Sequence, residues 1–167
     1  MMDADGTIIR SFMRETGAVE DYDRVVLLPN RFEAIRALSE QSEVRFALVS
    51  NQGGVAFGYQ TEAQVYAKMA AVCAELNCFF GQPFSVHVCF EHPKATIDKY
   101  RANSPRRKPG PGLLLEAMDA HLSWDTDEFI SDRQRDQAVF IGDLDTDREA
   151  AASAKVKYFD ADAFFAG

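Results

Sequence analysis

The segment Asp3-Ala4-Asp5-Gly6-Thr7 decides the fold, because it places two carboxylates two residues apart directly before a glycine. Gly6 permits a tight turn that brings both carboxylates to the same opening. In this arrangement Asp3 can attack a phosphoryl group as the nucleophile, and Asp5 can protonate the leaving oxygen and later deprotonate a water. Taken alone, the segment is also compatible with a polar surface turn.

Further segments downstream supply what such a nucleophile needs. They are Val49-Ser50-Asn51-Gln52, Arg107-Lys108-Pro109 and Gly142-Asp143, followed by Asp147. A phosphate monoester is anionic, so a carboxylate attacks it only where cations and hydrogen-bond donors offset the repulsion. Lys108 and the Ser50 hydroxyl are the candidates for that role. Each segment alone has an ordinary structural explanation, and their order and spacing favour the functional one.

The acidic residues also predict a magnesium site. Asp143 can share Mg²⁺ with the carboxylate of Asp3 and the main-chain carbonyl of Asp5, while waters and substrate complete the octahedron. Asp147 lies one helical turn after Asp143, where it can hold a metal-bound water or the ammonium group of Lys108. The alternative is that Asp143 and Asp147 are a helix cap and an exposed acid.

The spacing of apolar residues predicts alternating helices and strands. We expect helices over 32–38, 61–76, 111–122 and 145–154, and strands over 45–50, 85–90, 138–141 and 156–159. This alternation indicates an α/β fold with three layers, in which helices cover both faces of a mainly parallel sheet. Ligands bind such sheets beyond the carboxyl ends of the strands, where all the segments above lie. Residues 123–137 are expected to form a polar surface loop.

Composition limits the class of protein. The 167 residues suit a single domain, and 47 % apolar with 26 % charged residues excludes a disordered or fibrous chain. Free cysteines, the lack of a signal peptide and the lack of a long apolar run predict a cytoplasmic protein with no membrane contact. A net charge of −8 disfavours nucleic acid as a partner, although the segment 94–108 is basic. We also expect a monomer.

Taken in order, these segments resemble the haloacid dehalogenase (HAD) superfamily of phosphatases. Ser50-Asn-Gln-Gly-Gly-Val-Ala-Phe-Gly58 and Arg107-Lys-Pro-Gly-Pro-Gly112 are similar to the branch that holds histidinol-phosphatase, heptose-bisphosphate phosphatase and the 3′-phosphatase of polynucleotide kinase. The resemblance implies a Rossmann-like HAD fold without a large cap domain. It also implies that an aspartyl-phosphate forms on Asp3 and that Asp5 acts as acid and base. By the same resemblance the phosphate or substrate is contacted by Ser50, Asn51, Arg107 and Lys108. The implied magnesium ligands are Asp3, Asp5 and Asp143.

Three positions depart from the pattern of that branch. Its sugar-phosphate enzymes usually hold a structural zinc, but Glu91, Ser104 and Arg106 stand where three of its ligands are expected, so we expect no zinc beside Cys89. Leu144 stands where heptose-phosphate enzymes favour lysine, which weakens a heptose assignment. Only Met1 and Met2 precede Asp3, so either the first strand is short or the natural start lies upstream.

The prediction is therefore a magnesium-dependent phosphatase that acts on a small phosphorylated metabolite, such as a sugar phosphate or histidinol phosphate. Two alternatives remain at this point. One is a 3′-phosphatase that repairs nucleic-acid ends, to which the basic segment and the tail Tyr158–Phe165 give weak support. The other is a protein that keeps the fold and binds phosphate without turning it over, for which the short first strand is the main argument.

Overall fold

A five-stranded parallel sheet forms the centre of the protein. The computed structural model describes residues 1–11, 25–28, 31–40, 44–122 and 132–166. The strands are β1 (Met2–Asp3), β4 (Phe46–Asn51), β5 (Phe84–Cys89), β6 (Val139–Gly142) and β7 (Lys157–Asp160), in the spatial order β5-β4-β1-β6-β7. The chain fills one side of β1 with β4 and β5 and then crosses to the other side with β6 and β7. Such a switch point is where open α/β sheets bind ligands.

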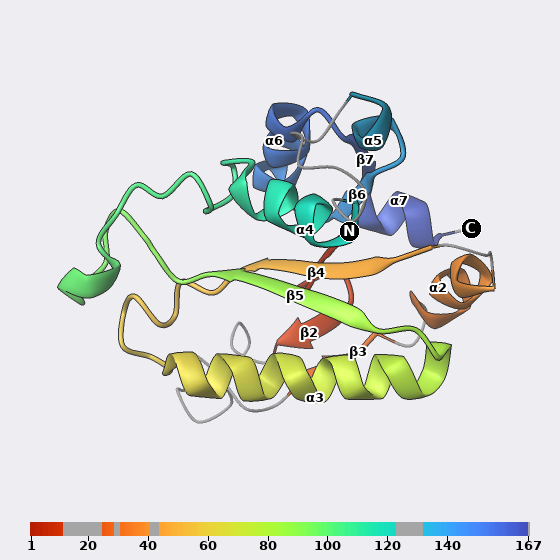
Figure 1. The fold of residues 1–167 in the computed structure, drawn as a ribbon. Helices are drawn as coiled ribbons and strands as arrows, with labels where there is room; N and C mark the ends of the chain where they lie inside the picture. Colours follow the sequence, from red (N-terminus) through yellow and green to blue (C-terminus); the bar gives the residue numbers. More distant parts are fainter. Residues whose placement is uncertain (12–24, 29–30, 41–43, 123–131, 167) are drawn as a thin grey trace.

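Helices cover both faces of this sheet, as Figure 1 shows. On one face α4 (Gly112–Leu122) and α6 (Asp145–Ala154) pack through Leu113, Leu114 and the small residue Ala150. On the other face lie α2 (Phe32–Ser39), α3 (Glu62–Phe80) and α7 (Ala161–Phe165), which contribute side chains such as Ile35 and Leu76 to a second core. The three-layer α/β architecture predicted from the sequence is confirmed.

The longest helix, α3, shows how local sequence sets these boundaries. Thr61 begins it with a reciprocal capping box, in which the Thr61 hydroxyl accepts from the amide of Gln64 and the Gln64 side chain accepts from the amide of Thr61. Gly81 ends it in the left-handed conformation, with φ of 63°. The helix therefore runs the length of the sheet and carries its buried side chains along one face.

The structure corrects the predicted elements in three places. An antiparallel pair, β2 (Ile9–Ser11) and β3 (Val25–Leu27), was not predicted. The predicted surface loop 123–137 contains the short helix α5 (Asp132–Asp136), whereas residues 123–131 lie outside the described residues. The tail Tyr158–Phe165 contains the end of β7 and the short helix α7, whose first turn is capped by the Asp160 side chain.

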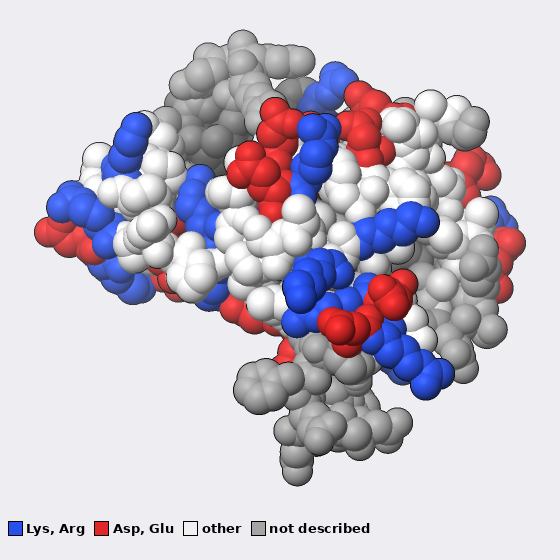
Figure 2. All heavy atoms as spheres, turned by 90° about the horizontal axis from the view of Figure 1, so that it is seen from above, with Lys and Arg blue, Asp and Glu red and all other residues white. Residues whose placement is uncertain are grey.

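A loop between β5 and α4 projects from the body of the protein and carries the short 3₁₀ helix η3 (Asp98–Tyr100), at the left of Figure 1. Figure 2 shows basic side chains gathered at this end of the molecule, with acidic ones at their edge. Lys99 pairs with Glu62 at the start of α3, and Arg106 pairs with Glu116 on α4. The positive charge of the basic segment is therefore partly neutralised by acids from other elements. Among the described residues, no helix is long and apolar enough to cross a membrane.

Candidate active site

The carboxyl edge of the sheet brings the predicted residues together. Asp3 is the last residue of β1 and pairs in register with Val49, one residue before Ser50 on β4. Asp143 directly follows β6, whose Ile141 pairs with Met2. Because neighbouring parallel strands end side by side, residues from distant parts of the sequence face the same opening.

Lys108 is the central cation of the site. Its side chain is 3 % exposed, and its ammonium group donates a hydrogen bond to Asp3 Oδ1. The same nitrogen lies 2.6 Å from Asp147 Oδ1 and donates to the Val49 carbonyl at 3.3 Å. One buried lysine therefore joins the end of β1 to the start of α6.

Burial and neighbouring charges shift the pKa values of Asp3 and Lys108. Burial raises the pKa of Asp3 to about 7, although the neighbouring Lys108 opposes that shift. Burial lowers the pKa of Lys108, but the carboxylates of Asp3 and Asp147 outweigh it, and the net pKa lies above its ordinary value. Lys108 is thus a permanent cation that compensates part of the negative charge gathered at the site.

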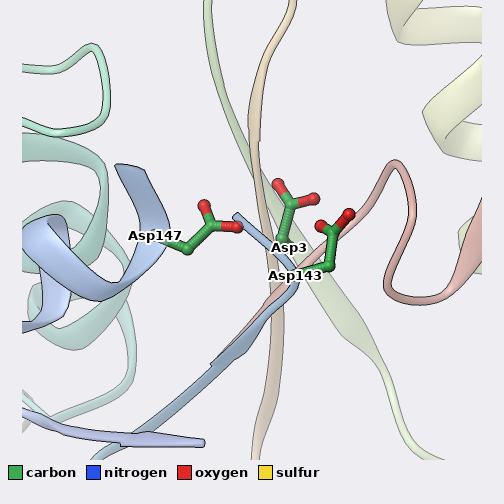
Figure 3. A group of neighbouring side chains, drawn as sticks. All are labelled: Asp3, Asp143 and Asp147. Carbon is green, nitrogen blue, oxygen red and sulfur yellow. The ribbon is translucent and has the colours of Figure 1, made fainter. Parts of the chain in front are cut away.

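Three carboxylates, those of Asp3, Asp143 and Asp147, converge at this edge of the sheet, as Figure 3 shows. Oxygens of Asp3, Asp143 and Asp147 lie within 4.8 Å of one another. Lys108 and the main-chain amide of Leu144 already engage Asp147, the latter at 3.1 Å. Asp3 and Asp143 are therefore the carboxylates best placed for a metal. A donor set made of oxygens fits Mg²⁺, which takes one or two protein carboxylates and retains waters.

Gly6 fits tightly beside this cluster. Its φ is 91°, and a Cβ at this position would lie 2.8 Å from the carboxylate carbon of Asp143. Its amide donates to the Ile9 carbonyl at 2.8 Å, which closes the turn that was predicted after Asp5. Only glycine combines this conformation with this close approach.

Asp5 is held by two side chains at the end of β4. Its Oδ2 accepts hydrogen bonds from the Gln52 side-chain amide at 2.7 Å and from the Ser50 hydroxyl at 3.3 Å. Its other oxygen, Oδ1, is buried and has no hydrogen-bond partner among the described residues. One oxygen is thus anchored, and the other is left for a group that enters the site.

Asn51 and Arg107 differ from the remaining predicted contacts. The Asn51 side chain donates to the Lys108 carbonyl at 3.0 Å and accepts from the Lys108 amide at 3.1 Å, so it fixes the main chain that carries the cation. Arg107 donates to the Glu91 carbonyl at 3.2 Å and lies against Gly53. It sits near the site rather than lining its cavity.

The cavity at this edge has a volume of about 110 Å³ and is lined by Asp3, Asp5, Ser50, Asn51, Lys108, Leu144 and Thr146. Pockets that enclose a whole small molecule have volumes of roughly 300 Å³ or more. The cavity is therefore large enough for one small anionic group, such as a phosphoryl group, while the rest of a substrate stays outside it. Leu144 and Thr146 were not predicted to line it.

Sequence reasoning also missed a buried polar group beneath Asp5. Gln52, Gln60 and Lys68 are 4 %, 7 % and 8 % exposed, and the side chains of Gln60 and Lys68 both donate to Gln52. A signal was present, because Lys68 falls on the same helical face as the buried Val65 and Val72. A lysine on the apolar face of a helix is unusual enough to mark a polar contact.

The segment around Cys89, where no zinc is expected, has its own set of side-chain contacts. The Cys89 thiol donates to Glu91 Oε2 at 3.0 Å, and burial raises the pKa of Cys89 to about 11. Arg106 donates to Glu116 and to the Val88 carbonyl. His92 Nδ1 accepts a hydrogen bond from the Lys94 amide at 3.0 Å.

Comparison with known proteins assigns the family. The family model described as polynucleotide kinase 3 phosphatase matches residues 1–167. The chain belongs to this family. The polynucleotide kinase 3 phosphatase family has the HAD-like fold, and the predicted HAD-type phosphatase is confirmed as the class of the protein.

Curated relatives and solved structures agree with this family. D-glycero-beta-D-manno-heptose-1,7-bisphosphate 7-phosphatase of Rhodopseudomonas palustris is 33 % identical over 137 residues, covering 82 % of this chain and 70 % of that protein. The enzyme of the same name from Escherichia coli K12 is 30 % identical, covering 84 % and 71 %.

Two solved structures share the fold of this family member. A HAD-like phosphatase from Mesorhizobium loti has a TM-score of 0.70 and 27 % identity, covering 93 % of this chain and 67 % of its own. D,D-heptose 1,7-bisphosphate phosphatase from B. bronchiseptica, complexed with magnesium and phosphate, has a TM-score of 0.69 and 22 % identity, covering 94 % and 76 %.

Proposed function

We propose that this phosphatase hydrolyses a phosphomonoester of a sugar through an aspartyl-phosphate on Asp3, with Mg²⁺ as cofactor. The observation that carries the proposal is the buried contact between Lys108 and Asp3 at the wall of a cavity of about 110 Å³. A carboxylate held by a cation beside an anion-sized cavity has the position required of a nucleophile.

Each residue has a separate role in this proposal. Asp3 attacks phosphorus, and the bond from phosphorus to the ester oxygen breaks as Asp5 donates its proton to that oxygen. Asp5 then removes a proton from the water that hydrolyses the aspartyl-phosphate. Lys108 and Ser50 hold the phosphoryl oxygens, and Asn51 keeps Lys108 in place through its main chain. Arg107 is placed to contact the part of the substrate outside the cavity.

Magnesium would be held by the carboxylates of Asp3 and Asp143 and the carbonyl of Asp5, with Asp147 supporting Lys108. The bound ion would supply positive charge that offsets the repulsion between the phosphate and the carboxylates. The magnesium and phosphate named for the B. bronchiseptica structure support this choice of metal.

The relatives support a sugar phosphate as the substrate class, since the proteins of R. palustris and E. coli are named heptose-bisphosphate phosphatases. The description of the matching family favours a second candidate, a 3′-phosphate at the end of a polynucleotide. The net charge of −8 and the pairing of Lys99 and Arg106 with acids argue against it, because nucleic-acid affinity depends on unpaired basic residues.

The test is phosphate release from sugar mono- and bisphosphates, histidinol phosphate and a 3′-phosphorylated oligonucleotide, with Mg²⁺ and with a chelator. We expect magnesium-dependent turnover of a sugar phosphate. Asp3→Asn should abolish it, whereas Asp145→Asn, which removes an exposed carboxylate two residues from Asp143, should not. Selective turnover of the oligonucleotide would replace the substrate class. Binding of phosphate without turnover of any substrate would support the silent alternative.

A further inference from the structure

We propose that Lys68 and Gln60 are positioning residues, which aim the amide of Gln52 at Asp5 and so hold Asp5 ready to donate its proton. This inference rests on the proposed role of Asp5 as general acid. It assigns a function to a buried lysine that contacts neither the cavity nor the carboxylate cluster.

The contacts form a short chain that starts inside α3. The Lys68 ammonium donates to Gln52 Oε1 at 3.3 Å, and the Gln60 side-chain amide donates to the same oxygen at 3.3 Å. On the other side of the Gln52 amide, its nitrogen donates to Asp5 Oδ2 at 2.7 Å and to the Ser50 hydroxyl at 2.8 Å. All the side chains between Lys68 and Asp5 are buried.

The chemistry of the donors fixes the direction of this chain. An ammonium group has donors only, so the Gln52 atom that faces Lys68 must be the carbonyl oxygen. The Gln52 nitrogen must then face Asp5, whose ionised carboxylate only accepts. Without Lys68 and Gln60, the Gln52 amide could rotate by half a turn and present its oxygen to the Asp5 carboxylate, which would repel it.

The consequence lies at Asp5. Gln52 anchors Oδ2, whereas Oδ1 is the oxygen without a hydrogen-bond partner among the described residues. A proton carried on Oδ1 is therefore presented by a carboxyl group whose orientation is fixed. Proton transfer to a leaving group needs heavy atoms within about 3 Å of each other, so a misdirected carboxyl group loses most of its effect.

Packing around the chain supports a dedicated role. Lys68 takes part in none of the ion pairs found within the described part of the protein, and burial of such a cation is costly. Gln60 packs against Gly54, where a Cβ would lie 2.9 Å from the Gln60 side-chain nitrogen. An apolar side chain at position 68 would avoid the cost of burying an ammonium group. The Lys68 ammonium group is instead used, together with the Gln60 amide, to donate to the Gln52 carbonyl.

The experiment compares leaving groups. A sugar alkoxide must be protonated as it leaves, whereas p-nitrophenolate leaves without a proton, so a fault in the general acid slows formation of the aspartyl-phosphate only from the sugar phosphate. Hydrolysis of the aspartyl-phosphate also needs Asp5 and is common to both substrates, so the comparison uses kcat/KM, which reports the first step alone. We expect Lys68→Met and Gln60→Leu to lower kcat/KM on the sugar phosphate by about tenfold or more and to leave kcat/KM on p-nitrophenyl phosphate within about twofold. Val72→Ala, a buried change on the same helix, controls for lost stability and should show no such selectivity.

Asp5→Asn separates this inference from the proposed function. Loss of about 10²-fold or more in kcat/KM on the sugar phosphate alone supports Asp5 as the acid. If Asp5→Asn is selective but Lys68→Met and Gln60→Leu slow both substrates equally, or neither, the positioning role is wrong and the proposed function stands. If Asp5→Asn is not selective, the general-acid assignment itself fails. In a Gln52→Leu background, Lys68→Met should add no further selectivity, since the chain is already broken.

Discussion

Lys108 contacts Asp3 across 105 positions of sequence, and the same ammonium group contacts Asp147. Three elements that meet only in the folded protein are therefore joined through one nitrogen. The chemistry proposed for Asp3 and the stability of the sheet edge depend on this contact together.

Lys108→Met should remove activity and stability at once. Loss of the cation leaves Asp3 and Asp147 buried beside each other, and breaking such a buried pair costs about 3 kcal/mol or more. We expect kcat to fall by about 10²-fold or more and urea to unfold the variant at lower concentration. Lys157→Met, at an exposed lysine on β7, should change neither. An unaltered urea midpoint for Lys108→Met would show that the contact does not stabilise the fold.

The raised pKa of Asp3 makes magnesium binding depend on pH. In the metal-free protein the carboxyl group has a pKa of about 7, above its ordinary 3.8, so the folded state holds a proton that the unfolded state releases. Stability from this group is therefore full below about pH 4 and is lost as the pH rises through about 7. Because Mg²⁺ requires the ionised carboxylate, it should raise the melting temperature more at pH 8 than at pH 5.5. Equal increases at both pH values would contradict the assignment of Asp3 as a ligand.

Gly6→Ala should cost more than the same change at Gly81. Both glycines have positive φ, 91° and 63°, so each alanine is strained by about 1–2 kcal/mol. At Gly81 nothing lies within 4 Å of the added carbon, whereas at Gly6 the carbon meets the Asp143 carboxylate. Because both variants share the strain of a positive φ, the extra loss in free energy of unfolding of Gly6→Ala over Gly81→Ala measures the clash with Asp143. We expect weakened Mg²⁺ affinity in Gly6→Ala alone, measured by calorimetry.

Asn51→Ala tests whether the main chain of Lys108 needs support. The change removes two hydrogen bonds that hold the residue before Pro109. We expect kcat/KM to fall by about tenfold or more, in the range seen when groups that orient a ligand are lost. Asn77→Ala, at an exposed position of α3, is the matched control. If Asn51→Ala keeps full activity, Lys108 is held by its ammonium contacts alone.

The alternation of strands and helices was predictable because each element repeats a simple period. The helix predicted near 145–154 has these bounds in α6, whose buried Ala150, Ala151 and Ala154 lie on one face. The pair β2–β3 was not predicted, because three-residue strands are too short to show a period. Its apolar residues near Ile9 were the available signal.

Contacts between side chains from distant elements were beyond the sequence. The segment 94–108 was predicted to be basic from its own residues, but Glu62 and Glu116 neutralise part of it from α3 and α4. Asn51 was predicted to contact phosphate or substrate, and nothing in the sequence indicated that its side chain also binds the main chain of Lys108. The sequence pattern shows which residues lie at the same edge of the sheet. It does not show which hydrogen-bond or ion-pair partner each side chain has in the folded protein.

The two-residue strand β1 has a consequence for how the protein acquires activity. It pairs with β4 on one side and β6 on the other, so Asp3 has no fixed position until both halves of the chain have docked. Thr7 meets Asp143 across 136 positions, a contact of very high sequence separation, and such contacts make folding slow. During refolding, hydrolysis should therefore return only when the whole sheet has formed. Partly folded chains should not act on cellular phosphate esters.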